Sequence, residues 1–327
     1  MDCNFKTAEG RFNFRVGAVI QRGGRLLGVH DRPGDEKFHY LPGGRVQLHE
    51  TMEEALRREL REELGVDSRV LRPLWLRECF DDGDEPPYHG FEVYFLVELD
   101  WDALPSTDGP FERADTGGEQ HFFNWIEPGS YQGYIHPEFV RRSFPELPES
   151  FTLITDRVSG GARPGGDVKF PTEAGLFNFR AAGIFVHEGK LLAMTEPGIG
   201  HYYLPGGRVR INEAMEEALR REVREELGVG SRLVRPLWLC ESFFPLGGRQ
   251  VHELAMYYLG ELDWERLPAL EGEFSLADSD GAEHSYRWLT EEEVKRARIY
   301  PIPMQECWPV LPEEFTLYSN VRDRRIL

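Results

Sequence analysis

The feature that most constrains this chain is one stretch of sequence that occurs twice. It reads GRVQLHETMEEALRRELREELGV at residues 44–66 and GRVRINEAMEEALRREVREELGV at residues 207–229. Each copy carries three glutamates at spacing i, i+3 and i+4, which places them on one face of a helix, converging on one point. They are Glu59, Glu62 and Glu63 in the first copy, and Glu222, Glu225 and Glu226 in the second.

Three carboxylates this close repel one another unless a cation lies between them. The alternative interpretation is a solvated acidic face on a surface helix, which is the role of most glutamate runs. Two observations favour the cation. A glycine-rich LPGG segment leads into each copy, and the same trio of carboxylates recurs in the second copy.

The repetition extends over nearly the whole chain. FNFR at residues 12–15 returns at 177–180, and ELDW at 98–101 returns at 261–264. Between the copies, SGGARPGG at residues 159–166 has the composition of a linker. We therefore predict two domains of one fold, 1–158 and 167–327, joined by the linker 159–166. We expect them to form an internal pseudo-dimer.

Local patterns predict mixed secondary structure. Strands are predicted at residues 14–21, 25–31, 70–80, 91–99 and 122–126, with counterparts in the second copy. Thr51 followed by Glu54 predicts a capping box, apolar residues then recur at helical spacing, and Gly65 predicts the helix end. Ala214 replaces the capping threonine in the second copy. Later helices are predicted at 137–143 and 290–298. Strands mixed with helices indicate an α/β or α+β fold.

Composition excludes several classes of function. The chain has 327 residues and a formal net charge of −19, which repels nucleic acid and free phosphates at long range. A nucleic-acid partner is therefore not expected. No apolar run is long enough to span a bilayer, so no membrane association is expected. The four cysteines lie far apart and the N-terminus lacks a signal-peptide pattern, so we expect a cytoplasmic protein.

The repeated stretch fits the pattern G-x5-E-x7-R-E-U-x-E-E-x-G-U, where U is aliphatic, and both copies match at every fixed position. This pattern resembles the signature of the Nudix hydrolases. The resemblance implies two α/β/α sandwich domains, each with a mixed sheet and the box helix packed against it. It also implies metal-dependent hydrolysis of a phosphoanhydride in a nucleoside diphosphate linked to another group X. The implied cofactor is Mg²⁺, with Mn²⁺ as a possible substitute, and the implied partner is a small nucleotide.

The resemblance also implies roles for individual residues. The metals would be held by the carboxylates of each trio and one glycine carbonyl, namely Gly43, Glu59, Glu62, Glu63, Gly206, Glu222, Glu225 and Glu226. Arg58 would pair with a glutamate and fix the loop against the helix, so that Glu50 and Arg58 are structural. Glu213 and Arg221 would have the same roles in the second domain.

The base that activates water is left open. The candidates are Glu59 and Glu222 in the boxes, or Glu119 and Glu283 in later loops, with Asp115, Asp278 and Asp280 as further loop carboxylates. Cationic residues near the expected phosphate path are Arg15, Arg45, Arg180 and Arg208, although an arginine at a strand end is as often a surface ion-pair partner. The aromatic residues Trp75, Phe80, Trp238 and Phe243 could stack on a base, but core packing is the commoner role.

Three functions compete. The first is hydrolysis in both domains. The second is a nucleotide-binding sensor with one or both domains silent, and the third is one active domain with a regulatory twin. Both boxes are intact, which favours hydrolysis. The loops 81–89 and 244–252 differ sharply, DDGDEPPYH against FPLGGRQVH, which predicts different substrate preferences or one dominant site.

Overall fold

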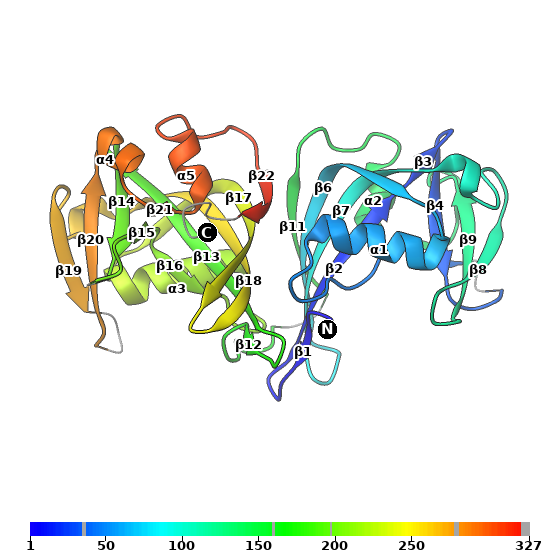
Figure 1. The fold of residues 1–327 in the computed structure, drawn as a ribbon, viewed down its shortest axis with the longest axis horizontal. Coiled ribbons are helices and arrows are strands. Elements are labelled where there is room, and N and C mark those ends of the chain that lie inside the picture. Colours follow the sequence, from blue (N-terminus) through cyan, green and yellow to red (C-terminus); the bar gives the residue numbers. More distant parts are fainter. Residues whose placement is uncertain (35–36, 159–160, 197, 278–280, 322–327) are drawn as a thin grey trace. The chain divides into compact units, whose positions relative to one another are not determined.

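The computed structural model describes residues 1–34, 37–158, 161–196, 198–277 and 281–321 (Figure 1). The chain divides into two compact units. One contains residues 1–6, 11–81 and 88–159, and the other contains residues 7–10, 82–87 and 160–327. Each unit carries one copy of the repeated stretch. The domain limits 1–158 and 167–327, and their pairing as a pseudo-dimer, stay predictions.

The first unit combines short and long strands with two α-helices. In chain order they are β1 (Asn4–Lys6), β2 (Arg11–Val19), β3 (Gln21–Arg22), β4 (Arg25–His30), β5 (Phe38–Tyr40), α1 (Met52–Leu64), β6 (Ser68–Asp81), β7 (Tyr88–Leu99), a 3-10 helix (Trp101–Ala103), β8 (Phe111–Ala114), β9 (Gln120–Ile126), β10 (Tyr134–His136), α2 (Glu138–Ser143) and β11 (Thr152–Arg157).

These strands form two mixed sheets. The first has the order β1-β2-β7-β6-β11, with β2 parallel to β7 and β6 antiparallel to β7. The second has the order β10-β5-β4-β9-β8, with β3 paired to β4. Helix α1 packs against β2 and β6, across the first sheet (Figure 1). Because α1 packs against β2, the helix face that carries the glutamates lies near Arg15 on that strand.

The second unit has a similar order of elements. Its elements are β12 (Lys169–Pro171), β13 (Leu176–His187), β14 (Lys190–Thr195), β15 (Tyr202–Tyr203), β16 (Gly206–Arg208), α3 (Met215–Leu227), β17 (Ser231–Leu246), β18 (Arg249–Leu262), a 3-10 helix (Trp264–Arg266), β19 (Glu273–Ala277), β20 (Glu283–Leu289), α4 (Glu291–Arg296), β21 (Ile299–Tyr300), α5 (Ile302–Cys307) and β22 (Thr316–Val321). Unlike those of the first unit, its strands join into one sheet, because β13 pairs with β14. The central order is β19-β20-β14-β13-β18-β17-β22, and β13 is parallel to β18. Both units are thus mixed α+β domains, as predicted.

The box helices begin and end where the sequence indicates. Thr51 accepts a hydrogen bond from the Glu54 amide, and the Glu54 carboxylate accepts one from the Thr51 amide, so the predicted capping box is present. Gly65 ends the helix at φ 65°, a left-handed conformation that favours glycine. In the second unit, Ala214 has no side-chain acceptor, and only the bond from its amide to Glu217 remains.

Two box positions adopt a left-handed backbone without glycine. His49 has φ 71° and Asn212 has φ 63°, each directly before the first box glutamate. The left-handed region is uncommon for residues with a Cβ, although asparagine and histidine enter it more readily than most. The turn therefore has the same left-handed conformation in both units. The residues at this position, histidine and asparagine, are among the non-glycine residues that adopt it with the least strain.

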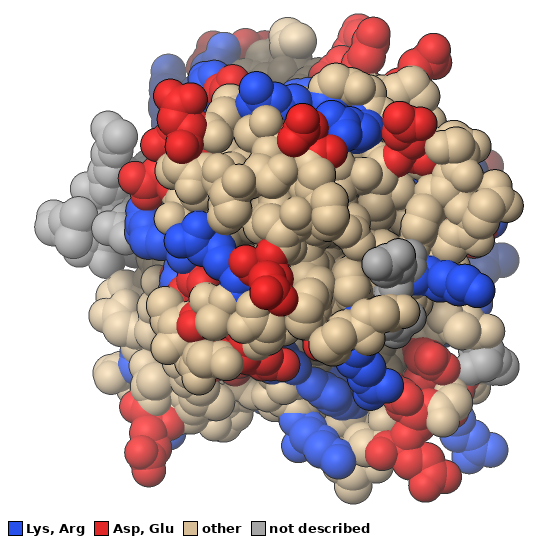
Figure 2. All heavy atoms as spheres, turned by 90° about the vertical axis from the view of Figure 1, so that its right-hand side faces the viewer, with Lys and Arg blue, Asp and Glu red and all other residues tan. Residues whose placement is uncertain are grey.

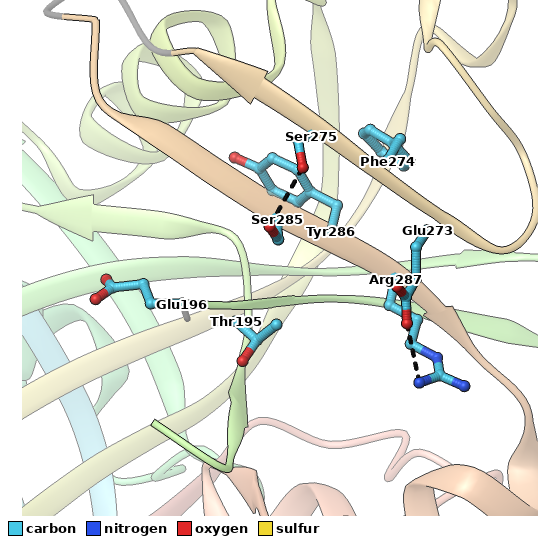
Figure 3. A pocket seen from close by; sticks show the side chains of 8 residues that line it. All are labelled: Thr195, Glu196, Glu273, Phe274, Ser275, Ser285, Tyr286 and Arg287. Carbon is cyan, nitrogen blue, oxygen red and sulfur yellow. Dashed lines mark hydrogen bonds and ion pairs between the residues drawn. The ribbon is translucent and has the colours of Figure 1, made fainter. Parts of the chain in front are cut away.

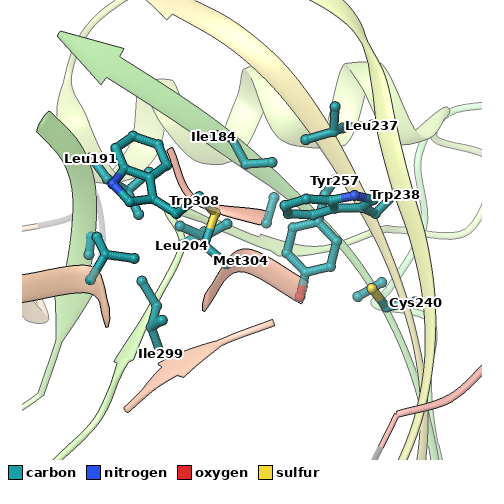
Figure 4. Close-up of a cluster of buried hydrophobic side chains, with 14 of the residues drawn as sticks. Ile184, Leu191, Leu204, Leu237, Trp238, Cys240, Tyr257, Ile299, Met304 and Trp308 are labelled. Atoms are coloured by element: carbon teal, nitrogen blue, oxygen red, sulfur yellow. The ribbon is translucent and has the colours of Figure 1, made fainter. Parts of the chain in front are cut away.

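Apolar side chains fill the interior of each unit. In the first unit the core includes Leu26, Leu74, Trp75, Ile126 and Val140. In the second, Trp238 is fully buried beside Tyr257, and Ile184, Leu191, Met304 and Trp308 complete the cluster (Figure 4). Trp75, Phe80 and Trp238 are therefore core residues, and Phe243 is partly buried.

No helix within the described ranges is long and apolar enough to cross a membrane. On the face drawn in Figure 2, acidic and basic side chains are interspersed rather than gathered into one continuous basic area. Such a face offers no track of positive charge for a phosphate backbone.

Candidate functional site

The three glutamates of the first box have different surroundings. Glu59 and Glu62 both accept hydrogen bonds from Arg58 Nη1, at 2.8 and 3.1 Å. Glu63 is only 9% exposed, and its Oε2 accepts a hydrogen bond from the Gly43 amide at 3.2 Å. The trio therefore lies on one helix face, as predicted, but does not meet at one point. Within the described part of the chain, no three His, Cys, Asp or Glu side chains form a group that could already hold a metal.

Arg58 joins the box loop to the box helix. Its Nε and Nη2 donate to the two carboxylate oxygens of Glu50 at 2.8 and 2.9 Å, and Nη2 also donates to the Arg45 carbonyl at 2.9 Å. Arg221 makes the same contacts in the second domain, with Glu213 and the Arg208 carbonyl. The predicted structural role of this arginine is confirmed in both units.

The two glycines before each box have no room for a side chain. A Cβ on Gly43, where φ is 135°, would lie 2.3 Å from the Val16 carbonyl oxygen. A Cβ on Gly44 would lie 2.2 Å from the Glu59 carboxylate. Gly206 and Gly207 are equally crowded, against the Ala181 carbonyl and the Glu222 carboxylate. Glycine thus lets the loop backbone approach the box carboxylates directly.

One pocket of about 650 Å³ brings the predicted residues of the first domain together. The candidates for metal binding, phosphate binding and base that line it are Arg15, Gly43, Arg45, Glu59, Glu62, Glu63, Asp115 and Glu119. Arg45 also donates to Asn13 Oδ1 at 3.3 Å and lies 3.6 Å from Asp2. This volume is within the usual range for a small-molecule site.

The corresponding residues of the second domain are placed less uniformly. Arg180 Nη2 donates to the Gly206 carbonyl at 3.0 Å, next to the box loop. Arg208 donates to Asn178 Oδ1 at 3.3 Å, as Arg45 does to Asn13. Glu283 is exposed at the first position of β20, paired with Ala277. Asp278 and Asp280 lie outside the described residues.

A smaller pocket of about 300 Å³ lies on strands β14, β19 and β20 of the second domain (Figure 3). Ser275 and Ser285 hydroxyls are 3.3 Å apart in it, and Arg287 pairs with Glu273 at 3.0 Å. None of its lining residues belongs to the box. This pocket is therefore separate from the box carboxylates.

Burial and charge repulsion perturb the third glutamate of each trio. Burial, and then the nearby Glu59 carboxylate, raise the pKa of Glu63 to about 8. Burial and Glu222 raise the pKa of Glu226 to about 7. Glu226 Oε2 is a buried oxygen that has no hydrogen-bond partner among the described residues. An orphaned oxygen among hard carboxylate donors suits a divalent cation, so these residues fit a metal of the magnesium type.

The pH dependence of stability provides a test of this electrostatic environment. An unfolded glutamate titrates near 4.3, whereas burial and Glu59 raise the Glu63 pKa to about 8 in the native state. The native state therefore binds the proton more tightly. Without metal, the free energy of unfolding should fall as pH rises from about 4.5 to 8, by up to about 1.4 kcal/mol per pH unit.

We expect Glu63→Gln in EDTA to match the wild type at pH 5 and to exceed it in stability at pH 8. Urea unfolding midpoints at both pH values measure the difference. Glu53→Gln, an exposed residue on the same helix, is the control and should show no such divergence. Parallel pH profiles for wild type and Glu63→Gln would contradict the electrostatic account.

The structure adds residues to the pocket that the sequence analysis did not select. His121 lies 3.4 Å from Asp31 and 3.7 Å from Asp115, and Tyr40 donates a hydrogen bond to Asp31. His121, Asp31 and Tyr40 all line the pocket, as do Glu92 and His136. The repeat itself held a signal for one of them, because QHFFNW at 120–125 returns as EHSYRW at 283–288 with the histidine in place.

Comparison with known proteins agrees with this arrangement. The NUDIX domain model matches residues 11–145 and 177–305. Similar solved structures include the E. coli ORF135 protein, at 24% identity over 40% of this chain and 86% of that chain, with a TM-score of 0.27. A MutT NUDIX hydrolase from Burkholderia pseudomallei has 22% identity over 40% and 95%, with a TM-score of 0.32. An ADP-ribose pyrophosphatase from Streptococcus suis has 16% identity over 43% and 97%, with a TM-score of 0.29.

The comparison with curated proteins gave no match. At the TM-scores above, likeness to single structures is limited, and family membership rests on the family model. That model covers most of the chain and includes both boxes with all their glutamates. The chain therefore belongs to the Nudix family and is a Nudix-type hydrolase of phosphoanhydride bonds with two NUDIX domains.

Proposed function

We propose that both domains hydrolyse the phosphoanhydride of a nucleoside diphosphate linked to a group X, with a divalent cation, Mg²⁺ or Mn²⁺, as cofactor. The observation that carries this proposal is the shared pocket of the first domain. It places the box carboxylates beside two arginines, Arg15 and Arg45, in a space large enough for a nucleotide.

The metal would be held by Glu59, Glu62 and Glu63 with the Gly43 carbonyl, and by Glu222, Glu225 and Glu226 with the Gly206 carbonyl. A bound divalent cation neutralises phosphate charge and acidifies an attacking water. In the described structure, Arg58 already compensates part of the charge of Glu59 and Glu62, while Glu63 depends on a single amide. Glu63 and its counterpart Glu226 therefore gain most from a cation.

The remaining pocket residues have distinct roles in this proposal. Arg15 and Arg45 would donate hydrogen bonds to phosphate oxygens, as Arg180 and Arg208 would in the second domain. Glu59 and Glu119 both line the first pocket, so each is a candidate to take the proton from the attacking water. In the second domain the candidates are Glu222 and Glu283.

A substrate panel tests the function. The full chain is incubated with nucleotide sugars, dinucleoside polyphosphates, ADP-ribose and nucleoside triphosphates, with magnesium or with EDTA. We expect nucleoside monophosphate, or another phosphate-bearing product, from at least one compound, with turnover lost in EDTA and restored by excess magnesium. Tight binding without turnover of any compound would instead identify a sensor, and turnover that survives EDTA would contradict the metal requirement.

A further inference from the structure

A buried charged cluster lies at the first-domain pocket, apart from the box carboxylates. Glu92 on β7 accepts hydrogen bonds at Oε2 from Arg77 Nη1 at 2.9 Å and from the Tyr94 hydroxyl at 2.6 Å. Arg77 Nη2 also donates to Asp156 at 2.7 Å. Glu92 and Arg77 are each 5% exposed. The reaction proposed above does not use this cluster, yet Glu92, Tyr94 and His136 line the same pocket as the box glutamates.

The cluster presents both a hydrogen-bond acceptor and a donor. Burial opposes ionisation of Glu92, but Arg77 and Tyr94 outweigh it and hold its pKa below the ordinary value, so the group is a carboxylate. Its Oε1 is 3.8 Å from Cys79 Sγ, a weak donor. His136 is neutral because burial lowers its pKa, and its Nε2 faces the donor Arg77 Nη1 at 3.4 Å. The histidine proton is therefore on Nδ1.

The chemistry of these groups selects one kind of ligand. An ionised carboxylate accepts hydrogen bonds from N–H groups. The aromatic ring of Tyr88 lines the same pocket, and such rings stack on flat heterocycles. Glu92 as acceptor and His136 as donor match the hydrogen-bonding edge of a nucleobase, and the aromatic ring matches its flat face. We propose that Glu92 Oε1 accepts a hydrogen bond from the nucleobase in the first domain, an inference that rests on the proposed function.

The second domain lacks this acceptor. Strand register makes Ala255 the counterpart of Glu92, since Glu92 pairs with Arg15 and Ala255 with Arg180. By the same strand pairing, Cys240 occupies the position of Arg77. Tyr300 occupies the position of His136.

The second domain has a carboxylate two residues earlier on the strand instead, roughly 7 Å away. There Glu253 accepts from Asn178 Nδ2 at 2.7 Å. The first domain has Gly90 at that position, where a Cβ would lie 2.5 Å from Cys79 Sγ. The relocated carboxylate gives the two domains different base preferences.

Binding of nucleoside diphosphates to the full chain tests this inference. Methylene-bridged ADP, GDP, CDP and UDP, which resist cleavage between the phosphates, are titrated with magnesium by calorimetry. We expect two classes of site with different base preferences in the wild type. Glu92→Gln should weaken the binding affinity of one class of site for its preferred nucleotide by roughly 10- to 100-fold, which is the loss expected for a hydrogen bond to a charged group. The affinities of the other class of site should not change.

Controls separate base recognition from a structural role. Glu98→Gln, on the same strand but paired with Arg69 at the surface, should leave all affinities unchanged. If Glu92→Gln fails to fold, Tyr94→Phe is the second variant, because it removes the hydroxyl that donates to Glu92 Oε2. It should change the affinity for the same nucleotide at the same class of site. An equal loss for all four bases, or no loss, would overturn the role of Glu92. Absence of binding by every nucleotide would instead overturn the proposed function, and this inference with it.

Discussion

Replacing Glu63 and Glu226 together by glutamine is expected to lower turnover of the best substrate by on the order of 100- to 1,000-fold, since a catalytic cation supplies several kcal/mol of transition-state stabilisation. Each residue is the most buried of its trio, and each has a strongly raised pKa that a cation would relieve. Initial rates at saturating magnesium measure the effect. The glutamines preserve the size of the side chains, so the fold should persist.

The single substitutions divide the activity between the domains. If the domains differ in substrate, Glu63→Gln should abolish turnover of some compounds and Glu226→Gln that of others. The matched controls are Glu53→Gln and Glu216→Gln, because both residues lie in the first turn of their box helix and form exposed ion pairs. Equal halving of the rate for every substrate would refute divergence of the domains, and full activity of the double variant would refute the metal site.

Arg58→Ala is expected to destabilise the first domain by about 2 kcal/mol, because its ion pairs are partly buried and fall between exposed pairs, worth up to about 1 kcal/mol, and buried pairs, whose disruption costs about 3 to 5 kcal/mol. Arg58 donates to Glu50, to Glu59, to Glu62 and to the Arg45 carbonyl. Without it, Glu50, Glu59 and Glu62 lose their hydrogen-bonded cation, and Glu59 keeps only the more distant attraction of Arg15. The midpoint of urea unfolding in EDTA measures the loss, and magnesium should restore part of it.

The neighbouring Arg57 provides the control for this variant. Arg57 forms an exposed pair with Glu53 one helical turn away, at 3.3 Å. Its replacement by alanine carries the same change in helix propensity, and the pair is worth less than about 0.5 kcal/mol. Similar midpoints for Arg57→Ala and Arg58→Ala would show that the Arg58 network adds no stability.

The sequence predicted those features whose causes are local. The capping box of Thr51 and Glu54 and the left-handed Gly65 depend on residues within a few positions of one another. The family resemblance implied that Arg58 pairs with a glutamate, and the structure shows that one such partner is Glu50. The short strands β1, β5 and β10 were not predicted, since three residues carry too little periodicity. Helix α5 was also missed, because it is only six residues long and follows a proline.

The sequence could not predict the parts of the pocket that come from distant strands. Glu92 reaches the cavity from β7 in the first sheet, and His121 and His136 reach it from β9 and β10 in the second sheet, so strand pairing within each sheet and packing of the two sheets bring them together. Their spacing along the chain carries no record of that pairing. The predicted convergence of the three box glutamates was also incomplete. Helical spacing places the backbones on one face but does not show that Arg58 draws two of the side chains toward itself.

Two box helices on one polypeptide have a consequence for the supply of the two activities. Every molecule synthesised carries one domain with Glu92 and one with Ala255 at the matching strand position. If both domains hydrolyse substrate, as proposed, the two activities are produced in a fixed one-to-one ratio, which neither dilution nor unequal expression can alter. Any shift in their balance has to come from substrate levels or from mutation within one half of the chain.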